Sequence, residues 1–445
     1  MPIRIAIVGS GPAGFYTASA LLKTCPNCEV DIIERLPTPY GLIRGGVAPD
    51  HQTTKRVADK YEQTAMMDRV RFYGHVEIGE HVSLDELREM YDAVVLAIGA
   101  RSDRPFAVPG ADKKGVYGAS AFVAWYNGHP DFQYLDPDLN TTGVAVVGNG
   151  NVAIDCARVL MRSPYGRAQT DLPEHARAMI DASPIQSVHV LGRRGPADAA
   201  FTNVELRELG ELTEAEPRVR AEQLPDDFEA ALQGYEGRDR RVRQRNLEVL
   251  TDYAARPIGA KPKALHLEFY ASPVEVLGGE RVEAIRCERT CVVDGRAQGT
   301  GTFFEIPCGL VVSAIGYRAE PMAGAPFDEA RGIVPNDGGR VEPGLYAVGW
   351  IKRGPVGVIS TNRPDGEEAA RCIQADIPPD GDAGKTGHEG LEALLSRRGR
   401  RWVGFHEWKR LDALERAAAT DGAPRRKFIS VDEMLAALDA DRKED

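Results

Sequence analysis

The 445-residue sequence lacks the features of several classes of protein. It has no apolar run that approaches the roughly 18 residues of a membrane-spanning helix. A strand-like segment, residues 3–8, begins almost at the N-terminus and leaves no room for a signal or transit peptide. The formal net charge of −11 disfavours a general attraction to nucleic acid. We therefore expect a cytoplasmic protein that binds neither nucleic acid nor membranes.

Cysteine is also scarce, and an odd number of seven favours reduced thiols over a disulfide framework. Cys25 and Cys28 have the spacing of a redox or zinc half-site, and Cys287 and Cys291 form a second close pair with the spacing CxxxC. A zinc site would need both pairs to meet. Cys25 and Cys28 fall between the first predicted helix and the second predicted strand, at the end remote from the glycine turn. We expect structural or surface cysteines and no bound metal.

Glycine turns carry the clearest positive signal. The apolar segment 3–8 runs into Gly9-Ser-Gly11-Pro-Ala-Gly14, and an apolar helix follows to about Leu22. In a dinucleotide-binding unit the first glycine permits the tight turn, the second lets a pyrophosphate approach the backbone, and the third lets the helix pack closely on the strand. The helix N-terminus adds unpaired N–H groups for the phosphates. A glycine turn alone is weak evidence, but strand, turn and helix in this order predict a nucleotide site.

A second unit repeats this order. The strand 144–147 (VAVV) leads into the turn 148–153 (GNGNVA), where Ala153 replaces the third glycine, and a helix is expected over 152–162. A chain of this length fits two or three domains. Two such units in one chain are hard to explain without two bound dinucleotides.

The residues at the end of the next strand separate the two ligands. Glu34 follows the first turn by about 20 residues, where a carboxylate accepts from ribose hydroxyls and would repel a 2′-phosphate. The second unit has Arg193 and Arg194 at this point. Two guanidinium groups suit a 2′-phosphate, so the second site should prefer NADP to NAD. The alternative is that both arginines are solvated loop charges.

The rest of the chain gives coarser expectations. Alternation at Val76 and Ile78 suggests a strand, and residues 205–245 look polar and helical. Alternating stretches at 264–276, 282–293 and 302–306 suggest an antiparallel meander. In the charged region after about residue 378, one helix is expected near 406–419.

By this point the residues resemble a known family, the adrenodoxin reductase-type ferredoxin–NADP reductases, including their bacterial members, over nearly the full length. The stretches that carry the resemblance are IAIVGSGPAGFYTA, LPTPYGLIRGGVAPDH, GNGNVAIDCARVL, GRRGPADAAFTNVELREL and VGWIKRGPVGVISTN. The family has an α/β fold with two Rossmann-like dinucleotide-binding domains of the glutathione reductase-like type. The resemblance implies an FAD-binding domain in two parts, 1–104 and 316–445, around an inserted NADP-binding domain, 105–315. The second FAD part would end in a charged helical tail, and the setting would be the bacterial cytoplasm.

The resemblance also implies contacts for both cofactors, FAD and NADP(H). The FAD contacts combine the first glycine turn with residues from several later segments: Gly9, Gly11, Ala13, Gly14, Glu34, Leu42, Ile78, Trp350, Gly357, Val358 and Ile359. The NADP contacts centre on the second turn and the arginine pair: Arg104, Asn149, Gly150, Asn151, Val152, Arg193, Arg194, Glu205 and Gly357.

Trp350 stands where many two-nucleotide flavoenzymes have an aspartate, directly after the late strand and Gly349. A large flat side chain there can cover the isoalloxazine and exchange places with nicotinamide. An ordinary core tryptophan is the alternative, but glycines at 349, 354 and 357 favour a backbone that approaches a ligand.

His51 is implied to lie beside the flavin and close to Glu208, and Asp155 is implied to join them. Without the resemblance, His51 would be read as the start of a helix over 53–66. A hydride passes directly from nicotinamide C4 to flavin N5, so the protein mainly stacks the rings and excludes water. The three residues would then tune the flavin or relay its proton.

The chain has no cluster site of its own, so an iron–sulfur ferredoxin is the expected electron partner of a monomeric enzyme. A quinone, dithiol or oxygen acceptor is the alternative, and a non-catalytic flavin subunit is a third reading. Against a net charge of −11, docking of an acidic ferredoxin needs a local positive patch. The densest candidate is a run of arginines, with a solvated helix face as the alternative: Arg238, Arg240, Arg241, Arg243 and Arg245.

Overall fold

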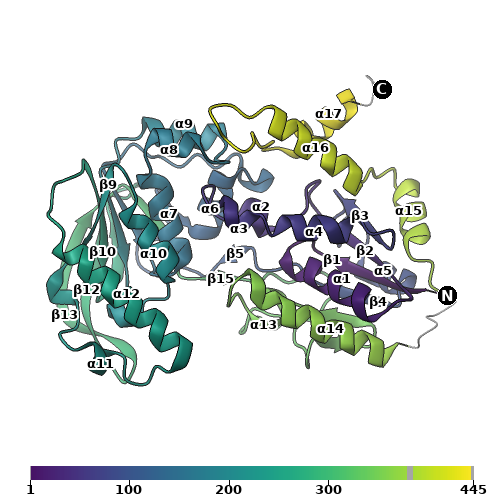
Figure 1. Cartoon of the computed structure of the whole chain (residues 1–445), viewed down its shortest axis with the longest axis horizontal. Coiled ribbons are helices and arrows are strands. Elements are labelled where there is room, and N and C mark those ends of the chain that lie inside the picture. The colour runs from purple at the N-terminus through teal and green to yellow at the C-terminus, as the bar shows by residue number, and fades with distance from the viewer. Residues whose placement is uncertain (1, 378–383, 442–445) are drawn as a thin grey trace.

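The computed structural model describes residues 2–377 and 384–441, and it contains two parallel sheets side by side (Figure 1). The first sheet has six strands in the order β16-β17-β4-β1-β2-β3, all parallel except β16. Its strands come from both ends of the chain: β1 (Ile3–Val8), β2 (Cys28–Glu34), β3 (Val70–Gly74), β4 (Ala93–Leu96), β16 (Arg340–Glu342) and β17 (Leu345–Ala347).

Two helices from opposite ends of the chain cover one face of this sheet. Helix α1 (Pro12–Thr24) begins with proline, whose fixed φ suits a first helical turn. Helix α14 (Asn362–Asp376) packs directly on it, since a Cβ placed on Gly366 would lie 2.7 Å from the Thr17 nitrogen. This close approach joins the two ends of the chain in one hydrophobic core.

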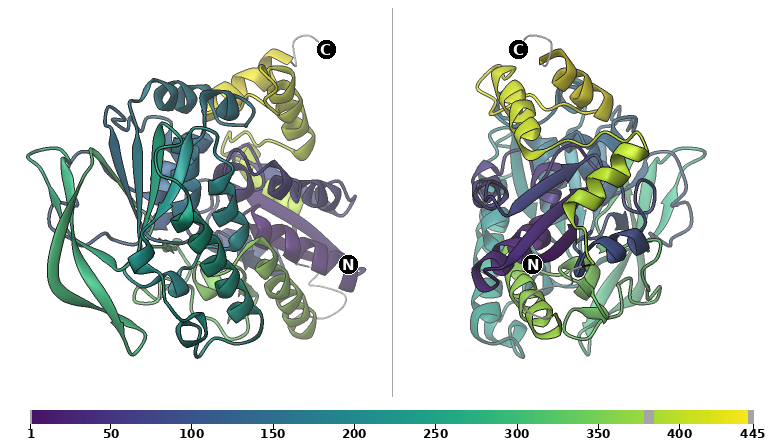
Figure 2. Two further views of the ribbon diagram at one scale, coloured as in Figure 1. Left: turned by 60° about the vertical axis from the view of Figure 1, so that its left-hand side comes forward. Right: turned by 90° about the vertical axis from the view of Figure 1, so that its right-hand side faces the viewer.

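The second sheet is parallel throughout, in the order β6-β14-β7-β8-β10-β9. Its strands are β6 (Val116–Gly118), β7 (Gly143–Val147), β8 (Ser187–Leu191), β9 (Ala215–Val219), β10 (Lys263–Glu268) and β14 (Leu310–Ser313). Helices α6 (Ala119–Asn127), α7 (Asn151–Met161), α10 (Asn203–Gly210) and α12 (Gly237–Ala255) belong to the same region. An antiparallel sheet of β11 (Ala271–Leu277), β12 (Ala284–Val293) and β13 (Arg296–Pro307) packs on the outer side (Figure 2).

The chain crosses between the two sheets at a short antiparallel pair, β5 (Ser102–Asp103) with β15 (Tyr317–Arg318). The α/β fold with two Rossmann-like sheets is confirmed. The domain bounds 1–104, 105–315 and 316–445 stay a prediction. Strands β5 and β15 lie next to the two predicted boundaries.

Shorter helices complete the layers: α2 (Leu42–Gly45), α3 (Gln52–Lys55), α4 (Ala58–Ala65), α5 (Leu84–Met90), α8 (Pro164–Ala168), α9 (Glu174–Ala182), α11 (Phe228–Ala231) and α13 (Trp350–Arg353). The C-terminal region forms α15 (His388–Arg397), α16 (Phe405–Ala417) and α17 (Val431–Asp441), where the sequence suggested one helix. None of the helices within the described ranges is long and apolar enough to span a membrane.

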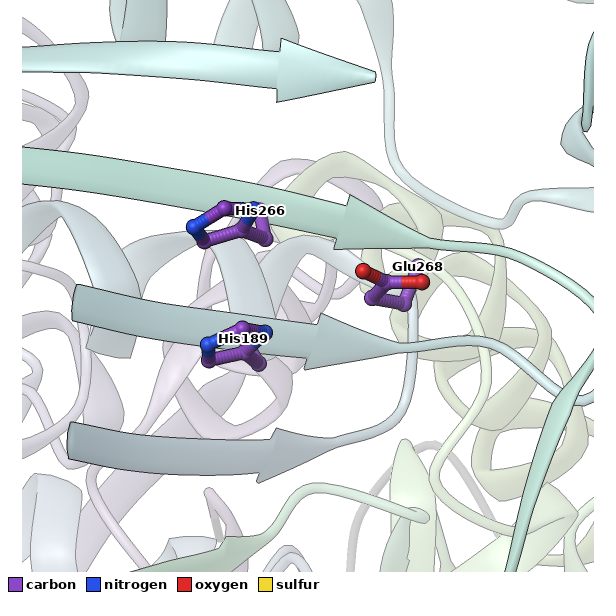
Figure 3. A group of neighbouring side chains, drawn as sticks. All are labelled: His189, His266 and Glu268. Atoms are coloured by element: carbon purple, nitrogen blue, oxygen red, sulfur yellow. The ribbon is translucent and has the colours of Figure 1, made fainter. Parts of the chain in front are cut away.

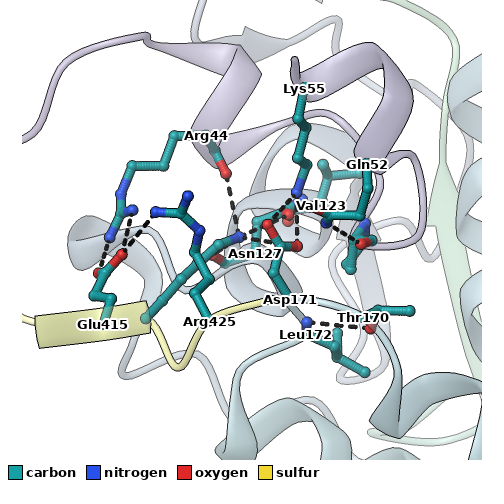
Figure 4. Close-up of polar contacts among 12 residues, drawn as sticks. Arg44, Gln52, Lys55, Val123, Asn127, Thr170, Asp171, Leu172, Glu415 and Arg425 are labelled. Atoms are coloured by element: carbon teal, nitrogen blue, oxygen red, sulfur yellow. Dashed lines mark hydrogen bonds and ion pairs between the residues drawn. The ribbon is translucent and has the colours of Figure 1, made fainter. Parts of the chain in front are cut away.

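The region around the first sheet (the first region) and the region around the second sheet (the second region) are both contacted by the segment between α16 and α17 (Figure 4). The Lys427 ammonium donates to the backbone oxygens of Arg44, at 3.3 Å, and Asn127, at 3.2 Å, and lies 3.4 Å from Asp171. Lys55 donates to both Asp171 oxygens at 2.7 Å. Burial lowers the pKa of Lys427 well below its usual value, and Asp171 compensates in part. A lysine near the C-terminus therefore bridges the first region and the second.

Three expectations about secondary structure were wrong. No strand forms at 76–78, because β3 ends at Gly74 and His75 adopts a positive φ of 65°. The stretch 264–276 is two strands in different sheets, β10 and β11, separated by Tyr270 with a φ of 53°. The polar segment 205–245 contains β9 as well as helices.

Candidate nucleotide and redox site

The first glycine turn has the geometry that each of its glycines was predicted to serve. Gly9 has a φ of 106°, and a Cβ there would lie 2.5 Å from the Ala97 oxygen. A Cβ on Gly14 would lie 2.2 Å from the Gly9 oxygen, so strand and helix touch at this point. A Cβ on Gly11 would meet nothing within 4 Å. The turn is closed toward the core and open at Gly11, at the N-terminus of α1.

Glu34 lies at the end of β2 and faces this turn. One of its oxygens accepts from the Ser10 N–H at 3.1 Å and from the Ser10 hydroxyl at 2.6 Å. The other accepts from the Leu36 N–H at 3.1 Å. Protein donors therefore fix the carboxylate in place at the strand tip, where a ribose would bind.

Other predicted FAD contacts border the same edge of the sheet. A Cβ on Gly349 would lie 2.6 Å from the Ala13 Cβ, so the late turn touches the first helix. Leu42 is 41% exposed and follows Gly41, whose Cβ would come within 3.0 Å of the Gly11 Cα. Ile78 lines a cavity of about 140 Å³.

Trp350 begins α13, and its ring lies 5.7 Å from that of Tyr317. Burial, followed by the neighbouring charges of Cys156, Asp103 and Asp155, raises the pKa of Tyr317. Tyr317 therefore lies within electrostatic range of Cys156 and Asp155 on α7. Trp350 is half-buried and packs against the hydrophobic core of the first sheet, and its role at the flavin stays a prediction.

Residues 356–358 are exposed to solvent, whereas Ile351, directly after Trp350, is fully buried. Gly357 has a φ of 91°, Val358 is 55% exposed, and Ile359 is half-buried. Asp365 of α14, which was not predicted from the sequence, accepts from the Gly349 N–H at 3.2 Å and from Arg353 at 2.8 Å. These contacts stabilise the turn at Gly349. No local sequence pattern around Asp365 predicts them.

The second glycine turn has the same form as the first with one substitution. Gly148 has a φ of 125°, and its Cβ would lie 2.3 Å from the Ala314 oxygen. A Cβ on Gly150 would meet nothing within 4 Å, whereas Ala153 is fully buried. The Asn149 oxygen accepts from the N–H groups of residues 200 and 201, and the Asn151 side chain accepts from the Thr202 N–H at 2.8 Å. Half-buried Val152 completes the turn.

The predicted selectivity residues lie beyond this turn. Arg193 is exposed, and Arg194 lies 3.4 Å from Asp198. One oxygen of Glu205, on α10, is buried without a hydrogen-bond partner among the described residues. An unpartnered buried oxygen fits a site that a ligand completes. Arg104 is exposed, and its backbone N–H donates to the Gly316 oxygen at 3.0 Å.

The structure brings His51, Glu208 and Asp155 into one ionic cluster. The His51 Nε2 lies 2.8 Å from Glu208. Buried Arg158 contacts Glu208 at 3.1 Å and Asp155 at 2.9 Å through one nitrogen. It also makes a two-point contact with Asp50, at 2.7 and 3.0 Å. The cluster joins the segment before α3 to helices α7 and α10 of the second region.

Burial and charge shift the titration of this cluster. Burial lowers the pKa of His51, but the hydrogen bond to Glu208 together with the charges of Asp155 and Asp50 outweighs it, and the net shift is upward. Burial raises the pKa of Asp155 to about 6 against the pull of Arg158. For Asp50 the balance reverses, because burial opposes and the two hydrogen bonds of Arg158 lower the pKa to about 2.

Asp50 and Arg158 were missed by the sequence analysis. Arg158 lies three residues after Asp155 in the predicted helix 152–162, a spacing that places both on one helical face. Because the rest of this helix is largely apolar, the two charged residues Asp155 and Arg158 together predict a buried ion pair.

Two other features bear on metal and thiol chemistry. Of the described residues, His189, His266 and Glu268 form a group with ligand atoms within 4.8 Å of one another (Figure 3). The imidazole rings are stacked, with 4° between their planes, and Arg220 donates to Glu268 at 2.6 Å. Parallel rings do not converge on one ion, so this group is a poor metal site.

All seven cysteines are free. Cys25 and Cys28 are buried, and burial together with Cys25 raises the pKa of Cys28 to about 12. The pair lies at the start of β2, whereas Glu34 lies at its end.

The arginine run divides into two groups on α12. Arg240 pairs with Glu229 at 2.5 Å, and Arg243 pairs with Asp239 at 3.1 Å. The other three are exposed: Arg238, Arg241 and Arg245.

Comparison with known proteins agrees with this geometry. A family model described as pyridine nucleotide-disulphide oxidoreductase matches residues 3–193. The NADPH-ferredoxin reductase FprA of Mycobacterium tuberculosis is 42% identical, covering 98% of both chains. Human mitochondrial NADPH:adrenodoxin oxidoreductase is 42% identical over 98% of this chain and 92% of its own length.

A solved structure of Mycobacterium tuberculosis FprA in complex with NADPH has a TM-score of 0.92 and 40% identity, covering 98% of this chain and all of the other. Identity at this level over almost the whole length is decisive for the family. The chain belongs to the adrenodoxin reductase-type ferredoxin–NADP reductases.

Proposed function

We propose that this chain oxidises NADPH by hydride transfer to FAD and then passes single electrons to a separate iron–sulfur ferredoxin, in a reversible reaction. The observation that carries the proposal is the pair of open glycine turns with opposite charges beside them. Glu34 suits the ribose of FAD, and Arg193 with Arg194 suits the 2′-phosphate of NADPH. FAD supplies the ability to accept two electrons and release them one at a time.

The protein's own residues hold the two nucleotides and keep them apart from water. Gly11 and Gly150 leave the helix N-termini accessible to the two pyrophosphates. Trp350 and Gly357 border the space for the flavin and nicotinamide rings, and Glu205 offers a buried acceptor to the nicotinamide half. Stacking at reacting distance is the main contribution that such a site makes to hydride transfer.

His51, Glu208 and Asp155 act on the flavin through charge. In this cluster Arg158 lies against several carboxylates, and the raised pKa of His51 favours its protonated form. In this role His51 tunes or protonates the flavin, Glu208 holds that proton in place, and Asp155 balances Arg158.

The most direct experiment is stopped-flow reduction of the purified protein by NADPH and by NADH. We expect faster flavin bleaching with NADPH at low concentration, and cytochrome c reduction that depends on added ferredoxin. Ferredoxin-independent reduction of a quinone or of oxygen at the same rate would favour the alternative acceptors. A dithiol acceptor is disfavoured by the position and burial of Cys25 and Cys28.

Ferredoxin docking is assigned to the exposed arginines of α12: Arg238, Arg241 and Arg245. Three exposed cations on one helix, with no ion pair to the residues that the structure describes, give the local positive field that an acidic partner needs. The cytoplasmic location and the monomeric state are also proposals, and analytical ultracentrifugation tests the latter.

A further inference from the structure

The loop after β8, which carries Arg193 and Arg194, is anchored through its backbone. The Gly192 N–H donates to the Glu268 oxygen at 2.8 Å, and the Gly192 oxygen accepts from the Ala271 N–H at 3.0 Å. The Arg193 oxygen accepts from the Thr290 hydroxyl at 2.7 Å. The β10–β11 connection and β12 therefore fix where both arginines leave the sheet.

The side chain of Arg194 is held as well, through a chain of contacts that leads to α12. Its guanidinium lies 3.4 Å from an Asp198 oxygen, and the same oxygen accepts from the Tyr235 hydroxyl at 2.8 Å. The Arg243 guanidinium stacks on the Tyr235 ring at 3.9 Å and donates to the Ala197 oxygen at 2.5 Å. In this series of contacts, Arg243 restrains Tyr235, Tyr235 restrains Asp198, and Asp198 restrains Arg194.

We propose that Asp198, Tyr235 and Arg243 are positioning residues that set the preference for NADPH by fixing Arg194 and its loop. This inference rests on the proposed function, in which Arg193 and Arg194 receive the 2′-phosphate. A guanidinium that is already oriented loses less conformational freedom when phosphate binds. Arg193, which is exposed, supplies the adaptable contact, and Arg194 supplies the fixed one.

This assignment gives the arginine run two separate roles. Arg243 faces the nucleotide loop and stacks on an aromatic ring, which a lysine does less well because it has no planar group. Arg238, Arg241 and Arg245 face solvent. One helix thereby supports nucleotide selectivity on one side and presents positive charge on the other.

Tyr235→Phe is the sharpest test, because it removes the hydrogen bond to Asp198 without changing any charge. With ferricyanide as acceptor, we expect the KM for NADPH to rise about three- to tenfold, the value of one hydrogen bond of roughly 1 kcal/mol. The kcat and the KM for NADH should stay at their native values. Tyr134→Phe is the matched control, since Tyr134 is 78% exposed, and it should change neither constant.

A double-mutant cycle with Arg194→Ala separates the inference from the function on which it rests. If Tyr235 acts through Arg194, Tyr235→Phe should have no further effect on the KM for NADPH in the Arg194→Ala background. Additive effects, equal losses for NADPH and NADH, or an unchanged KM in Tyr235→Phe would each overturn the inference. An Arg194→Ala enzyme with an unaltered preference for NADPH would instead overturn the proposed role of the arginine pair.

Discussion

The two nucleotide units begin alike and differ at the third position of the turn. Gly14 cannot carry a Cβ, because that atom would lie 2.2 Å from the Gly9 oxygen. Ala153, at the equivalent place in the second unit, carries its Cβ in a fully buried position. The helix of the second unit therefore stands slightly farther from its turn. The same fingerprint tolerates two packing distances, and only the first unit uses the closer one.

The helices that follow also differ. Helix α1 is uncharged until Lys23, whereas α7 carries Asp155 and Arg158. The first helix is enclosed by its own sheet and by α14. The second faces the first region, where Arg158 contacts Asp50 and the charge of Asp155 acts on His51. Helix α1 is therefore enclosed within its own region, whereas α7 forms a contact between the two regions.

The largest effect is expected from Gly14→Ala. The added methyl overlaps backbone and must push α1 away from β1, which removes N–H groups from the phosphates. A shift of this kind should weaken FAD binding by about a hundredfold or more. Flavin content after gel filtration measures it, and a variant that retains full flavin would show that the two turns are packed alike.

The arginine pair should give the next largest effect. Arg193→Ala with Arg194→Ala removes two charged contacts to phosphate and should raise the KM for NADPH roughly ten- to a hundredfold. The KM for NADH should hardly change, since NADH has no 2′-phosphate. Steady-state kinetics with both cofactors provide the measurement, and equal losses would place these arginines outside the site.

Asp155 makes the contact face of α7 sensitive to pH. Its pKa is raised to about 6 in the folded protein from an ordinary 3.8, so its favourable contribution is present below the lower value and is lost as the pH rises through the upper one. Asp155→Asn should gain about 1–3 kcal/mol in free energy of unfolding relative to the native chain between about pH 4 and pH 7. Urea unfolding at both pH values tests this, and a constant difference would contradict it.

The outer surface of the second unit should give a smaller effect. Arg241→Glu with Arg245→Glu should slow ferredoxin association about three- to tenfold at low salt and flatten its salt dependence. Flavin reduction by NADPH should keep its native rate. If the KM for ferredoxin is the same in both proteins, the docking surface lies elsewhere.

Ala153→Gly should have the smallest effect of all. This substitution gives the second turn the same three glycines as the first turn. The loss of the methyl group should lower the free energy of unfolding by about 0.5–1 kcal/mol. NADPH binding should be unchanged, because the phosphates meet the backbone at Gly150. A large loss of NADPH affinity would mean that the position of α7 is tuned to the ligand.

Much of this fold and part of the site could be predicted from local patterns. The strand, turn and helix of each unit are contiguous, so residues 3–24 and 143–161 carry their own evidence. The strand β9 could not be separated from polar helices, because this edge strand (AEPRV) contains two charged residues and little apolar alternation, although most of it is buried. Asp365 and Asp198 could not be found either, since each acts on a residue that only the folded chain brings close. The ion pair of Arg158 with Asp155 could be predicted from their spacing on one helix. The contact of Arg158 with Asp50 could not, because Asp50 lies far away in the sequence.

The first sheet is discontinuous in the chain, whereas the second is not. Strand β17, which pairs with β4, is synthesised only after every strand of the second sheet has been synthesised. We therefore expect the second region to fold first during translation, since its strands β6 to β14 are already complete. The purple and green segments that touch in Figure 1 would be joined last. Flavin capture is then a late event in biosynthesis, and chains that end before residue 340 should be able to bind the adenosine and phosphate half of NADPH but not FAD.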